Sequence, residues 1–166
     1  LPARSEMCIR DRINPFKLDY QVMGVYDASK LSMIIKTMKD LGRRKGIVLH
    51  GADGMDEATL SGDNEIYELH EDGTISHYFL NARDYGIANA SNIELQGGTP
   101  EENKNITVDI LSGKDYSPKR DVVVLNAAIA LYISNRVDSI RKGIDLAKLL
   151  IDSGKALKQC ELMKGE

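Results

Sequence analysis

Short apolar runs and stretches of helical periodicity alternate along the first part of the chain. Residues 21–26 (QVMGVY) form a short apolar run that predicts a strand, and between residues 30 and 41 the apolar positions recur three or four apart, which predicts a helix. Residues 46–50 (GIVLH) are continuously apolar and β-branched, as expected of a strand covered on both faces. Strand, helix and strand in this order are typical of a βαβ crossover and favour a parallel sheet.

The remaining pattern predicts a β-hairpin followed by helices. The runs at residues 65–69 and 75–80 flank Asp72-Gly73, a pair typical of hairpin turns. Beyond Gly97-Gly98, helical periodicity predicts three helices, at residues 100–111, 140–151 and 156–163, and Ser117-Pro118 has the form of a further helix start. Residues 122–131 are apolar nearly all round, which favours a helix buried on most of its faces. The expected fold class is α/β, with a mainly parallel sheet, flanking helices and the hairpin.

The first twelve residues stand apart from this pattern. Leu1–Arg12 has neither helical nor alternating apolar periodicity, and its MCIRDR stretch looks like a translated sequencing adapter. We therefore expect residues 1–12 to be a non-native or disordered tail, a natural disordered terminus being the alternative, and residues 13–166 to be part of one α/β domain.

Composition narrows the classes of protein that remain. A chain of 166 residues with 42% hydrophobic content is long enough for one sizeable core. The net charge of −3 gives no cationic surface for nucleic acid or anionic lipid, and no apolar run reaches the roughly 20 residues that cross a bilayer. The two cysteines, Cys8 and Cys160, have no metal or disulfide spacing. We expect a cytoplasmic protein without nucleic-acid or membrane partners.

The segment His50–Glu57 (HGADGMDE) is the best candidate for chemistry. It directly follows the predicted buried strand, and loops at the carboxyl ends of parallel strands are where α/β proteins bind ligands. Asp56 and Glu57 offer adjacent carboxylates, and Mg²⁺ is commonly held by one or two carboxylates together with substrate phosphates and water. The role of Asp53 stays open. An acidic surface loop with turn glycines is the alternative interpretation.

Other polar residues have simpler interpretations. Gly97-Gly98 is expected to be a turn that leads into a capping box of Thr99 and Glu102. Asn126, on the apolar helix, is expected to be a hydrogen-bonded core amide, and the cluster at residues 43–45 (RRK) is expected to be solvated. The histidines at positions 50, 70 and 77 have no metal-ligand spacing.

Several segments resemble those of anthranilate phosphoribosyltransferases, and they occur in that family's order. They are INPFKLDYQVMGVYD, IVLHGADGMDEATLSG, ARDYGI, LQGGTPEENKNITVDILSG, RDVVVLNAAIALY and SIRKGIDLAKLLIDSGKAL, which together cover residues 13 to about 157. The resemblance implies the C-terminal part of the large α/β domain of a nucleoside phosphorylase and phosphoribosyltransferase type of fold. It also implies transfer of a phosphoribosyl group from phosphoribosyl pyrophosphate to anthranilate in tryptophan biosynthesis, with release of pyrophosphate.

The same resemblance implies roles for particular residues. Asp56 and Glu57 match the family's metal-binding pair, so Mg²⁺ would stabilise the negative charge that develops on the leaving pyrophosphate. The family's phosphate-binding GTGGD loop, its KHGN-type segment, its anthranilate-binding arginine and its helical dimer interface do not occur in these 166 residues. We therefore expect the catalytic residues to lie mostly outside this chain, the chain alone to be inactive, and a homodimer to belong to the complete enzyme.

Two other functions remain as alternatives. One is a nucleic-acid-binding relative of the same fold without enzymatic activity, which would need a basic groove. The other is a nucleoside phosphorylase, which cleaves a ribose bond without this acidic loop, and whose family the GGTPEEN and LNAAIALY segments fit less well.

Overall fold

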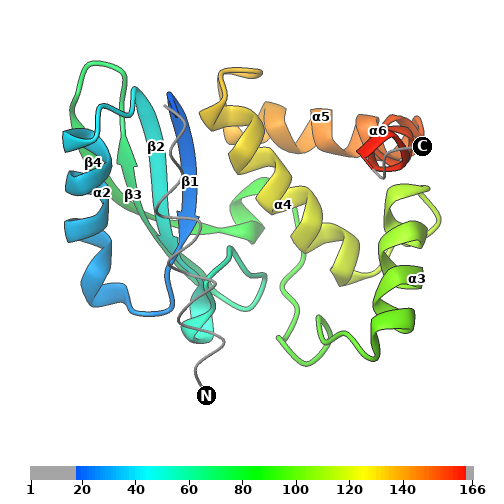
Figure 1. The fold of residues 1–166 in the computed structure, drawn as a ribbon. Coiled ribbons are helices and arrows are strands. Elements are labelled where there is room, and N and C mark those ends of the chain that lie inside the picture. The colour runs from blue at the N-terminus through cyan, green and yellow to red at the C-terminus, as the bar shows by residue number, and fades with distance from the viewer. Residues whose placement is uncertain (1–17, 164–166) are drawn as a thin grey trace.

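The computed structural model describes residues 18–163, which form one mixed β-sheet with helices on both faces (Figure 1). The predicted tail at residues 1–12 lies outside the described residues. Along the chain the elements are β1 (Tyr20–Gly24), η1 (Ala28–Lys30), α2 (Leu31–Asp40), β2 (Lys45–His50), η2 (Ala52–Gly54), β3 (Asp63–Leu69), β4 (Ile75–Asn81), η3 (Ala82–Tyr85), α3 (Pro100–Leu111), α4 (Pro118–Ile133), α5 (Ile140–Asp152) and α6 (Lys155–Met163).

The four strands lie in the order in which they occur along the chain, β1-β2-β3-β4. β1 and β2 pair in parallel through the predicted crossover, whereas β2 with β3 and β3 with β4 pair antiparallel. The α/β class and the hairpin are thus confirmed, but the expectation of a mainly parallel sheet is wrong for the described strands. The reason is the connection after β2, because residues 51–62 contain only a single 3-10 turn and no helix that could carry the chain back across the sheet.

α2 and α4 cover opposite faces of the sheet (Figure 1). Val48 packs into the cluster under α2 with Leu31 and Ile35, while Ile47 and Leu49 belong to the larger cluster under α4. Successive side chains of a strand point to opposite faces, so a strand between two layers must be apolar at every position. This explains the unbroken apolar run that identifies β2 in the sequence.

The hairpin and the helices begin where the sequence predicts. Gly73 has φ +81°, the left-handed conformation that the turn between β3 and β4 requires, and the Thr74 amide donates to the Asp72 carboxylate. Thr99 and Glu102 form the predicted capping box at the start of α3. Ser117 caps α4 and Ser139 caps α5 through their side-chain oxygens.

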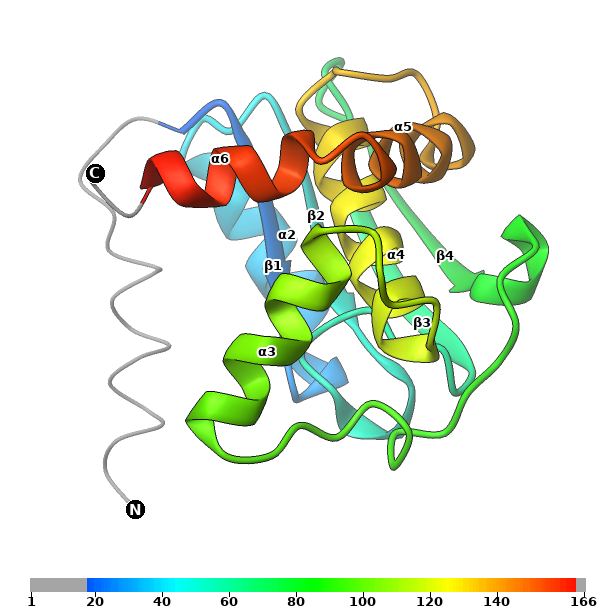
Figure 2. The ribbon, with the colours of Figure 1, turned by 90° about the vertical axis from the view of Figure 1, so that its right-hand side faces the viewer.

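α4 is buried on the sides that face the sheet and α5, but not on most of its faces. Leu125 and Ile129 are fully buried, whereas Val123 and Ala130 on the other side are exposed. This other side lines an apolar surface groove with residues of α3, α5 and α6, the helices that stand beside α4 in Figure 2. The expectation of a helix surrounded on most faces is therefore only partly confirmed. Among the described residues, no helix is both long enough and apolar enough to span a membrane.

Candidate functional site

The predicted acidic loop is a tight turn at the carboxyl end of β2. Gly51 donates its amide to the carbonyl oxygen of Met55 at 2.8 Å, and the two residues form an isolated antiparallel bridge. Between them Asp53 (φ +61°) and Gly54 (φ +82°) are both left-handed, an arrangement that reverses the chain sharply and that Asp and Gly tolerate better than most residues. The turn places Asp56 and Glu57 directly after the reversal.

Asp56 and Glu57 are exposed, and their carboxylates make no hydrogen bond or ion pair with other residues in the range 18–163. The chain that follows them is different, because Ala58, Thr59 and Leu60 are almost completely buried. Two charged side chains thus project from the start of a buried segment. Carboxylates in this state keep their lone pairs available for a ligand.

Asp53 has a weak contact with the loop that follows β4. Its carboxylate lies 3.5 Å from Nδ2 of Asn92, at the long limit of a hydrogen bond. The Oδ1 atoms of Asn89 and Asn92 are buried and have no hydrogen-bond partner in the described part of the chain. The structure therefore brings the loops at residues 51–57 and 86–99 together, but it does not give Asp53 a defined role.

The two carboxylates of Asp56 and Glu57 are better suited to a magnesium ion that also binds water and substrate than to a metal held by protein ligands alone. Within residues 18–163, no three side chains of His, Cys, Asp or Glu converge on one point. Mg²⁺ does not need such a group, because it keeps several waters and binds through one or two carboxylates plus substrate phosphates. Two adjacent, unpaired carboxylates are suited to that mode of binding.

The other sequence candidates make contacts within the protein. The ring nitrogens of His50, His70 and His77 lie 2.8, 2.8 and 2.9 Å from the Val25 carbonyl oxygen, the Ser76 hydroxyl and the Glu65 carboxylate. The Gly98 amide donates to Oδ1 of Asn103, but the turn expected at Gly97-Gly98 is not formed there: residues 92–95 form a turn, and residues 96–98 are irregular chain that leads into α3. The amide of Asn126 is hydrogen-bonded to Ala58 and Val122, which confirms that it is satisfied, although the residue is partly buried and not in the core.

A buried polar cluster near the amino end of β2 was not predicted. Lys45, expected in a solvated cluster, is 8% exposed, because it is the first residue of β2 and its ammonium lies 3.6 Å from the centre of the Tyr132 ring. Glu68, 3% exposed, accepts hydrogen bonds from the hydroxyls of Tyr132 at 2.7 Å and Tyr78 at 2.9 Å. Burial, followed by the nearby Glu68 charge and hydrogen bond, raises the pKa of both tyrosines, and burial lowers the pKa of Lys45. The position of Lys45 directly before the GIVLH run was the available signal.

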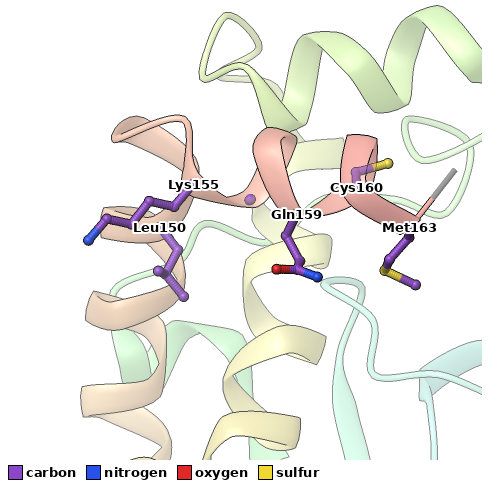
Figure 3. Close-up of a pocket in the computed structure, with 6 residues that line it drawn as sticks. Leu150, Lys155, Gln159, Cys160 and Met163 are labelled. Atoms are coloured by element: carbon purple, nitrogen blue, oxygen red, sulfur yellow. The ribbon is translucent and has the colours of Figure 1, made fainter. Parts of the chain in front are cut away.

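Two surface hollows lie on the helical side of the molecule. One is the apolar groove beside α4, and the other is lined by Leu150, Lys155, Ala156, Gln159, Cys160 and Met163 (Figure 3). Neither is lined by a residue of the acidic loop. The groove beside α4 is lined almost entirely by apolar side chains, and the polar residues of the other hollow, Lys155, Gln159 and Cys160, form no group of metal ligands within the described residues.

Comparisons with known proteins agree on one family. Residues 12–157 match the family described as "Glycosyl transferase family, a/b domain". An anthranilate phosphoribosyltransferase of Staphylococcus haemolyticus is 67% identical over 154 residues, which are 93% of this chain and 46% of that protein. The chain thus spans about half the length of the curated relatives it matches.

Solved structures show the same fold. The anthranilate phosphoribosyltransferase of Thermus thermophilus superposes with a TM-score of 0.79 at 31% identity, over 86% of this chain and 41% of that one. The Saccharomyces cerevisiae enzyme in complex with PRPP and Mg has a TM-score of 0.77 at 23% identity over the same shares of the two chains, a likeness that concerns the fold alone.

Proposed function

The chain belongs to this glycosyl transferase family, and from that premise we propose that it forms the magnesium-binding part of an anthranilate phosphoribosyltransferase. The reaction is transfer of the phosphoribosyl group of phosphoribosyl pyrophosphate to the amine of anthranilate, which gives N-(5-phosphoribosyl)anthranilate and pyrophosphate. A relative named for this activity is 67% identical to the chain over 154 residues. Mg²⁺, phosphoribosyl pyrophosphate and anthranilate are the ligands that this function requires.

The observation that carries the proposal is the state of Asp56 and Glu57. Both carboxylates are exposed and unpaired, and both stand on a turn at the carboxyl end of a parallel strand. Most other acidic side chains near the sheet have protein partners, such as Asp63 with Asn81 and Glu65 with His77. An acidic pair that the fold holds in place but does not neutralise is suited to a cation brought by the substrate.

The chain's contribution to catalysis would be electrostatic. The transfer breaks the C1–O bond of the ribose and forms a C1–N bond to the amine, and a bound Mg²⁺ would compensate the negative charge on the departing pyrophosphate. Asp56 and Glu57 would fix the position of that ion, because Mg²⁺ is a hard cation that prefers oxygen ligands such as carboxylates. The turn at Asp53-Gly54 would set the direction in which the pair faces. As the resemblance implies, residues outside this chain would orient the amine of anthranilate.

The chain spans about half the length of its relatives, and this bears on the activity of the isolated polypeptide. Because catalysis needs groups that are positioned together, we expect the 166-residue chain alone to form no measurable product. The homodimer of the complete enzyme and the cytoplasmic location stay predictions. No observation favours a nucleoside phosphorylase or a nucleic-acid-binding protein over the transferase.

A hybrid enzyme tests the proposal. In the S. haemolyticus relative, the 154 matching residues are replaced by those of this chain, and product formation from anthranilate and phosphoribosyl pyrophosphate is followed across a magnesium titration. The hybrid should be active, and Asp56→Asn with Glu57→Gln should lower kcat/KM by about a hundredfold or more while the melting temperature is kept. A folded hybrid without activity, or a double variant as active as its parent, would overturn the proposal.

A further inference from the structure

We propose that Gly24, Gly51 and Asn126 are positioning residues for the metal-binding pair: they hold the backbone of residues 56–58 so that both carboxylates face the ligand without reordering of the loop. This inference rests on the proposed function, since it concerns how Asp56 and Glu57 are held. Gly24 lies in β1, Gly51 is the first residue of the loop after β2, and Asn126 lies in α4, so the backbone of residues 56–58 is contacted from three places in the fold.

The two glycines leave room for the carbonyl groups of the acidic pair. A Cβ atom on Gly24 would lie 1.5 Å from the carbonyl oxygen of Asp56, and one on Gly51 would lie 2.0 Å from that of Glu57. Neither glycine has a positive φ, so neither is required by its own backbone conformation. Each is required because the backbone of a metal-binding residue occupies the space of a side chain.

Asn126 holds the next residue from the other side. Its Oδ1 accepts from the Ala58 amide at 3.1 Å, and its Nδ2 donates to the Ala58 carbonyl at 2.7 Å. A further bond from Nδ2 to the Val122 carbonyl at 2.9 Å fixes the side chain against its own helix. One amide thus satisfies both backbone groups of a fully buried residue 68 positions away in the chain.

The next residue, Thr59, is held in the same way, by an asparagine side chain that bonds to both of its backbone polar groups. Asn64 accepts from the Thr59 amide at 2.7 Å and donates to the Thr59 carbonyl at 3.1 Å. Two consecutive residues therefore have both backbone polar groups bonded to asparagine side chains instead of to a neighbouring strand. The segment directly after the acidic pair is buried and hydrogen-bonded although it belongs to no helix or strand, whereas the two carboxylates have no partner among the described residues.

This arrangement would lower the cost of binding a metal. A flexible acidic loop loses conformational freedom when a cation orders it, and that loss subtracts from the affinity. Where the backbone is already fixed, only the two side chains remain to be ordered. Residues that orient metal ligands typically change the affinity by about 10- to 100-fold when they are replaced.

The test uses the ¹⁵N-labelled 166-residue chain and Mn²⁺ as a paramagnetic probe. Mn²⁺ should broaden the amide signals of residues 54–58 in the parent, and Asp56→Asn with Glu57→Gln should abolish that broadening. Asn126→Leu keeps a similar volume but removes the bonds to Ala58, and it should raise the Mn²⁺ dissociation constant about tenfold or more. Ile129→Val, which changes the buried side of the same helix, should leave the dissociation constant unchanged.

Gly24→Ala provides a second, independent variant in case Asn126→Leu does not fold. Its control is Gly143→Ala on α5, whose Cβ would also meet backbone, 2.6 Å from the Ala128 carbonyl oxygen, but away from the acidic loop. The dissociation constant should rise about tenfold or more for Gly24→Ala and stay at the parental value for Gly143→Ala, even where both lower the melting temperature.

The outcomes separate the two proposals. Parental affinity in both Asn126→Leu and Gly24→Ala, with broadening that still depends on Asp56 and Glu57, would overturn the positioning role and leave the metal site intact. Broadening in the parent that the Asp56/Glu57 variant retains would overturn the metal site itself, and the positioning role with it.

Discussion

The acidic side chains at the two ends of β2 differ in burial and in hydrogen bonding. At the carboxyl end Asp56 and Glu57 are exposed and unpaired, and the protein fixes only the backbone beneath them. At the amino end Glu68 is buried, with two tyrosine hydroxyls on its carboxylate and the Lys45 ammonium nearby. A carboxylate with all its partners inside the protein stabilises the fold, whereas one without partners is available to a ligand. The comparison predicts where substitutions affect stability and where they affect binding.

The largest effect on stability is expected from Glu68→Ala. The substitution leaves the hydroxyls of Tyr78 and Tyr132 without their acceptor and removes the negative charge near Lys45. Hydrogen bonds to a buried charged group are worth about 1.5 to 3 kcal/mol each, so the free energy of unfolding should fall by about 3 kcal/mol. Urea denaturation measures this difference.

Glu65→Ala on the same strand is the matched control. Glu65 is less buried and pairs only with His77, so its loss should cost about 1 kcal/mol or less. Equal losses in the two variants would mean that the cluster around Glu68 is no more stabilising than a surface pair, and the contrast between the two ends of β2 would disappear.

A smaller effect is expected from Tyr132→Phe. The ring and its contact with the Lys45 ammonium remain, but the hydrogen bond to Glu68 at 2.7 Å is lost. The free energy of unfolding should fall by about 1 to 2 kcal/mol. Tyr26→Phe serves as the control, because Tyr26 is 72% exposed and should show no change in urea denaturation. If both variants unfold at the parental midpoint, the hydroxyl of Tyr132 is not part of a stabilising network.

Alkaline pH should lower the free energy of unfolding through the tyrosines near the amino end of β2. Burial raises the pKa of Tyr78, Tyr85 and Tyr132 above the usual 10.0, so above about pH 10 the folded state holds more protons on these groups than the unfolded state. Stability is then fully present below pH 10 and falls as the pH rises. Lys45 acts in the opposite direction, because its pKa is lowered in the folded state, but it is one group against three.

Denaturation between pH 8 and 11 measures this dependence. The slope of stability against pH above pH 10 should be smaller in a Tyr78→Phe variant with Tyr132→Phe than in the parent. An unchanged slope would assign the alkaline loss of stability to other groups.

The sequence predicted the elements better than it predicted these two sites. Helices and strands follow local periodicity and caps, such as Thr99 with Glu102, so their bounds agree with the structure to within a few residues. The position of the acidic loop could be read from the sequence because the loop directly follows a recognisable buried strand, whereas its metal-binding role stays a prediction. The partner of Lys45 and Glu68 could not be read locally, since Tyr132 lies 87 and 64 positions away from them. The position of Lys45 before the GIVLH run was the only local signal. For the same reason, the bonds of Asn126 to Ala58 were beyond a local interpretation.

The smallest effect on stability is expected from Asp56→Asn with Glu57→Gln. Neither carboxylate has a partner among residues 18–163, and both are exposed, so the free energy of unfolding without metal should change by about 0.5 kcal/mol or less. Removing two adjacent like charges also relieves their repulsion, which works against any loss. Asp40→Asn with Asp145→Asn is the control, because it removes two exposed charges on α2 and α5. Without metal, the two double variants should unfold at similar urea concentrations. When Mg²⁺ is added, the urea midpoint should rise for the parent and for the control but not for the loop variant. A cation stabilises only a folded state that binds it. If the free energy of unfolding of the loop variant is several kcal/mol lower than that of the control, Asp56 and Glu57 stabilise the fold, as Glu68 is expected to do. They would then not be groups kept free for a ligand.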